Sequence, residues 1–198
     1  MGLQSELLPV GGSEFPHRDN DGNLIAQGEG DSGRKPFTKR PLGTDFPTLV
    51  IEAGYSQSWA SLRAKGRWWF ESSDYAVKIV LLMKMDRSTA QIRIEKWKAM
   101  EQPRTRPSRA ITRAMAAQVV PSVSPECVQT VDIIRAASVG DHDPRRFLPN
   151  SYRVTRGLLC LEFEDLFLRR PGPGEHDIVF GTKELQEFAV RFWRSYHQ

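Results

Sequence analysis

The sequence is most informative in one short run, Thr48-Leu49-Val50-Ile51-Glu52. Residues that are β-branched and apolar favour strands, so this run predicts an interior strand that closes on an acid. Ser56 or Ser58 can cap a following helix, which we expect at about residues 59–71. A second run, Val77–Met83, is almost continuously apolar and predicts a central strand covered on both faces. These features indicate a strand–helix–strand unit.

The remaining elements extend this unit toward the end of the chain. Alternation over residues 91–97 predicts a half-exposed strand antiparallel to its predecessor. Further strand-like runs occupy residues 127–134 and 152–163. A helix capped by Thr182 has a single apolar stripe, made by Leu185, Phe188, Ala189, Phe192, Trp193 and Tyr196. We expect this helix to pack on its own sheet; docking to a partner is the alternative.

Two segments interrupt the pattern. Residues 1–47 are rich in Gly, Pro and Asp, and they predict only one short edge strand, Leu7–Val10. Residues 99–125 hold four prolines with arginines between them, which predicts a loop or insertion with one helical turn near residues 110–118.

The fold class expected from these elements is α/β (α+β), with a mixed central sheet flanked by helices. The division is a core at residues 1–98, a loop or insertion at residues 99–125, and C-terminal strands and a helix at residues 126–198. We expect this last part to pack on the same domain.

Composition narrows the function classes without choosing one. The 198 residues carry a net charge of +4, which permits a nucleic-acid partner but does not require it. Cys127 and Cys160 have no partner at metal-binding spacing, which excludes a thiolate zinc site, and we expect both to be buried thiols. No apolar stretch reaches the ~20 residues of a membrane helix. We therefore expect no membrane partner and an intracellular location, cytoplasmic or nuclear; oligomeric state stays open.

Two acids could carry chemistry. Glu52 ends a buried strand near the beginning of the next helix, where negative charge is favoured, and sites in α/β sheets form at such strand ends. Asp31 lies in a Gly-rich segment that could run beside this strand. Grouped carboxylates are what Mg²⁺ needs for phosphodiester hydrolysis. The structural alternatives are that Glu52 accepts hydrogen bonds from the helix and that Asp31 is a turn residue.

The region around Glu52 resembles a known family. Residues 47–58, together with Leu62, Trp68-Trp69 and residues 77–82, are similar to fungal proteins of restriction-endonuclease-like fold in the PD-(D/E)XK nuclease superfamily. The segment Gly30–Pro36 looks like the one that carries their first acid. The resemblance spans about residues 28–97, with a weaker likeness around residues 163–188. It implies a restriction-endonuclease-like core to which the C-terminal helix is added.

The resemblance also assigns roles to individual residues. It implies that Asp31 and Glu52 bind a magnesium ion. The catalytic lysine of the family is expected two positions after Glu52, where this chain has Gly54. Relatives that supply the cation from the following helix nominate Lys65, or Arg63 less well; as the alternative, Lys65 is a solvated helix charge.

The resemblance also implies a supporting role for Gln57, which would orient water or a ligand. The family's first core helix has no counterpart at the start of this sequence. The function implied is magnesium-dependent phosphodiester hydrolysis of nucleic acid. The alternative is a catalytically inactive relative that binds nucleic acid or protein.

Overall fold

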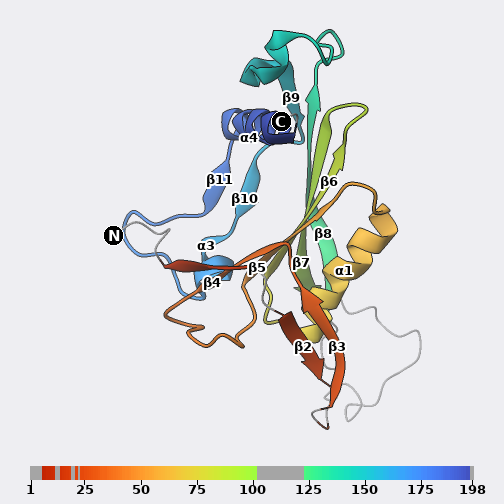
Figure 1. Cartoon of the computed structure of the whole chain (residues 1–198). Helices are drawn as coiled ribbons and strands as arrows, with labels where there is room; N and C mark the ends of the chain where they lie inside the picture. The colour runs from red at the N-terminus through yellow and green to blue at the C-terminus, as the bar shows by residue number, and fades with distance from the viewer. Residues whose placement is uncertain (1–5, 12–13, 19–20, 22, 102–122, 197–198) are drawn as a thin grey trace, which may run out of the picture.

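The computed structural model describes residues 6–11, 14–18, 21, 23–101 and 123–196 (Figure 1). The strands and helices are β1 (Leu7–Val10), β2 (Glu14–Arg18), β3 (Leu24–Glu29), β4 (Ser32–Pro36), β5 (Leu49–Gly54), α1 (Trp59–Ser72), β6 (Ile79–Asp86), β7 (Gln91–Glu101), β8 (Val123–Arg135), the 3₁₀ turns η2 (Pro144–Phe147) and η3 (Pro149–Ser151), β9 (Tyr152–Thr155), β10 (Leu159–Leu161), α3 (Phe163–Phe167), β11 (Ile178–Phe180) and α4 (Thr182–Tyr196).

A mixed seven-stranded sheet is the centre of the fold, in the order β1-β4-β5-β6-β7-β8-β9. Strands β5 and β6 are parallel and α1 connects them, while each other neighbouring pair of this sheet is antiparallel. The pairs β2–β3 and β10–β11 form two small separate sheets. The mixed α/β architecture expected from the sequence is therefore confirmed.

Helix α1 covers one face of the sheet (Figure 1). It begins where the Ser58 side chain accepts a 3.1 Å hydrogen bond from the backbone N–H of Ser61, a regular N-cap. Its Trp69 and Phe70 are fully buried and belong to one apolar cluster with Val80 and Leu82 of β6. The side of the sheet that α1 covers is the α1 face.

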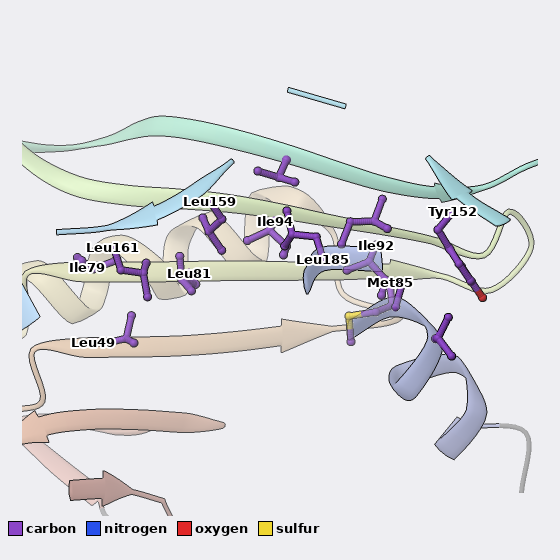
Figure 2. Packing of buried hydrophobic residues seen from close by; sticks show 14 of the residues in the cluster. Leu49, Ile79, Leu81, Met85, Ile92, Ile94, Tyr152, Leu159, Leu161 and Leu185 are labelled. Atoms are coloured by element: carbon purple, nitrogen blue, oxygen red, sulfur yellow. The ribbon is translucent and has the colours of Figure 1, made fainter. Parts of the chain in front are cut away.

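The opposite face is covered by α3, α4 and the antiparallel β10–β11 pair, which meet the sheet in a larger apolar cluster (Figure 2). Leu81 of β6, Leu159 of β10 and Leu185 of α4 all belong to it. At its edge the Thr48 hydroxyl donates a buried 2.8 Å hydrogen bond to the carbonyl of Leu166, 118 residues away along the chain. The beginning of β5 is therefore fixed by a residue of α3.

Most expected elements are confirmed within a few residues. Strands form at the runs beginning at Thr48, Val77, Gln91 and Cys127, and helices form after Ser58 and from Thr182. The apolar stripe of α4 buries Leu185, Ala189 and Trp193 against the chain's own sheet, as expected.

The single strand-like run predicted at residues 152–163 is wrong. Arg156 has a φ of 63°, so the backbone turns through the left-handed region and leaves the sheet after β9. The chain then forms β10 beside β11, and Phe163 already begins α3. Apolar residues on both sides of the turn hid this change of direction.

Three further expectations need correction. The first 47 residues contain β2, β3 and β4 besides the expected edge strand β1. The connection between β7 and β8 is shorter than the predicted loop at residues 99–125, because β7 continues to Glu101 and β8 begins at Val123. Residues 102–122, which include the predicted helical turn, lie outside the described residues. The two cysteines were expected to be buried, but Cys127 is exposed and Cys160 is half-buried.

Candidate functional site

Glu52 is a buried carboxylate on the α1 face of β5, with 1% of its surface exposed. Its Oε1 accepts a 2.5 Å hydrogen bond from Nε1 of Trp69, and its Oε2 lies 2.6 Å from Nζ of Lys65. Both partners come from α1, where positions four residues apart lie on one side of the helix. The helix therefore holds a neutral donor and a cation above the same strand residue.

The contact with Lys65 is an ion pair rather than a regular hydrogen bond. Oε2 of Glu52 is buried and accepts no hydrogen bond of regular geometry from the described residues, while the Lys65 side chain is 37% exposed. The pKa of Glu52 is raised, chiefly because burial disfavours its charge; Lys65 and Trp69 oppose this effect, and the charge of Asp31 adds to it.

Asp31 immediately precedes β4, and it meets the end of β5 because these strands are antiparallel, with Ser32 opposite Ile51. Its Oδ2 accepts a 2.7 Å hydrogen bond from the backbone N–H of Ala53, the residue after Glu52. Asp31 itself is exposed. The two acids chosen from sequence therefore lie at the same end of β5, and Asp31 is bonded to that strand.

Gln57 lies over Gly54, the position at which the family has its lysine. A Cβ atom built on Gly54 would be 3.5 Å from both Cβ and Oε1 of Gln57, an ordinary van der Waals contact. The Gln57 carbonyl accepts a hydrogen bond from Nζ of Lys84, which ties the loop before α1 to β6. Gln57 is exposed and adjoins the site rather than entering its buried part.

Arg63, the second candidate for the catalytic cation, pairs with a different acid. Its Nε and Nη2 bond both carboxylate oxygens of Glu95 on β7, at 3.0 and 2.6 Å. Nε1 of Trp97 donates to Glu95 as well, at 3.0 Å. Lys65 is therefore the helix cation at Glu52.

Sequence reasoning missed the polar part of Trp69, which it assigned to the core. The residue is fully buried as expected, but its indole N–H is also the donor that orients Glu52. The available signal was the spacing of Lys65 and Trp69, about one helical turn apart, in the helix that follows the strand containing Glu52. Glu95 was missed because it alternates normally within a half-polar strand.

Asp31 and Glu52 are the carboxylates that could hold a metal here. The part of the chain that the structure describes contains no group of three or more His, Cys, Asp or Glu side chains placed to bind one ion. Any ion at this site would take its remaining ligands from water or from a substrate. The same described part contains no helix long and apolar enough to cross a membrane.

No protein-family model matches the sequence, and no curated protein matches it. The geometry near the end of β5 is therefore the basis for assigning a function.

Proposed function

We propose that this chain has a restriction-endonuclease-like core of the PD-(D/E)XK type and hydrolyses phosphodiester bonds of nucleic acid with magnesium. One observation carries the proposal: the residues nominated as two metal ligands and a displaced cation come from three separate segments of the chain and meet near the end of β5. Lys65 contacts Glu52 directly, and Asp31 bonds the adjacent residue of the strand.

The arrangement of the elements supports the proposal. Strands β1, β4 and β5 are neighbours in the sheet, and α1 then leads to β6, parallel to β5. Three strands, a helix and a further strand are the elements expected of such a core after its first helix, which has no counterpart among the described residues.

The residues fit a magnesium ion held by two carboxylates, which is a common arrangement when water and phosphate complete the ligand set. Oε2 of Glu52 contacts Nζ of Lys65 at 2.6 Å, so Lys65 has to move away for this oxygen to bind the ion. Asp31 is exposed at the same end of β5. A bound magnesium ion would supply charge neutralisation at the phosphate and a positioned water.

The chain's own residues have distinct roles in this proposal. Asp31 and Glu52 bind the ion and fix its place relative to β5. Trp69 holds Glu52 in one orientation through the 2.5 Å bond to Oε1. Lys65 turns its ammonium from Glu52 toward the phosphate, which is feasible because its side chain is partly exposed. Gln57 orients water or substrate from the loop.

The second candidate is an inactive relative that binds nucleic acid or protein. It is favoured by the burial of Glu52, whose two oxygens already face Trp69 and Lys65. In that case the ion pair only stabilises the contact of α1 with β5.

Cleavage assays separate the two candidates. Purified wild type, Glu52→Gln, Asp31→Asn and Lys65→Ala would be incubated with plasmid DNA, single-stranded DNA and RNA, with Mg²⁺ or EDTA. We expect magnesium-dependent cleavage by the wild type and a reduction of about 10²-fold or more in each variant, typical when a group that stabilises the transition state is removed.

Glu164→Gln and Lys183→Ala are matched controls, because these charges are exposed on α3 and α4. They should cleave like the wild type. Cleavage that persists in Glu52→Gln and Asp31→Asn would come from a contaminant. A folded wild type that cleaves none of the substrates would overturn hydrolysis and leave the binding role.

A further inference from the structure

A cavity of about 290 Å³ lies between the central sheet and α4, on the face of the sheet opposite to Glu52. Its apolar walls include side chains from two strands of the sheet, from the β10–β11 pair and from α4, namely Leu81, Met83, Ile94, Leu159, Phe180 and Phe188. Leu81 belongs to the cluster on this face, whereas the next residue, Leu82, packs with α1 on the other. The cavity is therefore separate from the candidate site.

The exposure of the wall residues shows where the cavity opens. Leu81, Ile94 and Leu159 are buried and close its inner end (Figure 2). Met83 and Phe188 are half-buried, and Phe180 is exposed. The outer end of the cavity is therefore accessible from solvent.

The size and the apolar walls of this cavity suit an apolar ligand. Protein interiors contain few voids larger than a water molecule, because side chains pack closely. An apolar cavity stays dry, and one of about 150 Å³ is enough to bind benzene. A methylene group occupies roughly the volume of one water molecule in the liquid, about 30 Å³, so the cavity has room for a chain of about eight carbons.

The rim of the cavity on α4 carries Glu184, Glu187 and Arg191. The spacings of three and four residues place their side chains along one side of the helix. None of the three forms an ion pair or a hydrogen bond through its side chain with another described residue. Two acids and one arginine leave the rim with one excess negative charge.

Glu187 is the acid of this rim that the fold does not explain. Glu184 lies in the first turn of α4, where the helix dipole favours a negative charge. Glu187 is half-buried one turn further along, beside a second acid that repels it. Arg191 is at a spacing that permits pairing with Glu187, but the structure shows no ion pair between them. A cation from outside the described chain would be favoured here.

We propose that this cavity binds an amphiphilic cation. An apolar chain of about eight carbons fills the space under α4, and an ammonium head pairs with Glu187 and Glu184 at the rim. The excess negative charge of the rim favours an ammonium over a carboxylate. This site is additional to the proposed hydrolysis and does not depend on it, because it lies on the other face of the sheet.

Three ligands with the same chain test the proposal. Octylamine, 1-octanol and octanoic acid are cationic, neutral and anionic at pH 7. Isothermal titration calorimetry at low salt gives the affinity of each for the full chain. The ¹³C-methyl NMR signal of Met83, assigned with Met83→Leu, shows whether the ligand enters the cavity. We expect this signal to move, and octylamine to bind about tenfold more tightly than octanol, as expected for one charge-assisted hydrogen bond. Octanoic acid should bind more weakly than octanol.

Two variants separate the head from the chain. Glu187→Gln keeps the size of the side chain, so octylamine should lose about tenfold in affinity while octanol binds as before. Met83→Trp places a larger side chain at the cavity and should weaken all three ligands. Glu164→Gln, an exposed acid on α3, is the matched control and should bind like the wild type. Circular dichroism checks that each variant is folded.

Equal affinities for the three ligands, or tighter binding of octanoic acid, would overturn the cationic head. No binding, or binding that leaves the Met83 signal unmoved, would overturn the site itself. An equal loss of octylamine affinity in Glu164→Gln would contradict the role of Glu187. Sedimentation velocity tests the other occupant: a dimer that octylamine dissociates would show that a second copy of the chain covers the cavity, and would overturn the proposal of a small ligand.

Discussion

The indole N–H of Trp69 and the carboxylate of Glu52 form a 2.5 Å hydrogen bond inside the protein, where both side chains are at most 1% exposed. Gly30 also packs on this indole, since a Cβ there would lie 3.3 Å from the ring. One aromatic side chain therefore contacts Glu52 and the residue next to Asp31, and it links the two acids.

Trp69→Phe should destabilise the protein. The change keeps most of the ring but leaves Oε1 of Glu52 without its donor, which costs about 1–3 kcal/mol for a buried acceptor. Urea unfolding measures the decrease, and Trp68→Phe on the same helix is the control with a smaller expected effect. In the Glu52→Gln background, position 52 carries no charge that needs the donor. The loss of unfolding free energy caused by Trp69→Phe should therefore be smaller there. An equal cost in both backgrounds would contradict the role of the bond.

Glu52 should make stability depend on pH. Its pKa is raised in the folded protein, so the folded state binds a proton more tightly than the unfolded chain does. The free energy of unfolding then falls as pH rises from the ordinary glutamate pKa through the raised value. Thermal unfolding of the wild type and Glu52→Gln between pH 4 and 8 tests this. The variant should gain relative to the wild type across that window; a constant difference would refute the prediction.

A lysine at position 54 should replace Lys65. Gly54 has room for a side chain, with the nearest contacts of a Cβ at 3.5–3.6 Å, and it lies two residues after Glu52 on the same face of β5. If Lys65→Ala reduces cleavage by about 10²-fold, adding Gly54→Lys should recover a large part of it. Gly54→Gln is the uncharged control and should recover nothing. A double variant as inactive as Lys65→Ala would show that the cation must come from α1.

Arg169 should connect the beginning of the described chain to the segment before β11 in an acid-sensitive way. It bonds Glu6, beside β1, and Glu175, before β11, and this arginine lowers the pKa of Glu175 to about 2. A depressed pKa gives stability that is present above the unfolded value of 4.5 and lost as pH falls toward 2. Thermal unfolding should show that Glu175→Gln differs from the wild type at pH 6 and that the difference closes at pH 2. A difference that persists at pH 2 would contradict this account.

The sequence predicted the parts of the fold that depend on local pattern. The apolar run at Thr48, the cap at Ser58 and the stripe of α4 each identify an element without tertiary information. Strand β4, Ser32–Pro36, was missed because its residues are mostly polar; β1 and β5 supply its hydrogen bonds from both sides. Such pairing depends on neighbours that a local pattern does not contain.

For the candidate site, the sequence predicted which residues take part but not their contacts. Glu52 and Asp31 were nominated from the strand pattern and Lys65 from the resemblance, and the three lie together. Neither source specified how they contact one another. The roles of Trp69 and Trp97 as donors depend on how α1 and β7 pack. The pairing of Arg63 with Glu95 depends on which face of the sheet Glu95 occupies. These are tertiary properties, and local sequence patterns did not indicate them.

The 118-residue separation between Thr48 and Leu166 has a consequence during protein synthesis. Strands β5 and β6 leave the ribosome well before α3 and α4, whose side chains cover Leu49, Ile79 and Leu81. Until then one side of the nascent sheet is open apolar surface, which favours aggregation or capture by chaperones. Translation pauses placed after residue 101 should therefore lower the yield of native protein more than pauses placed after residue 196.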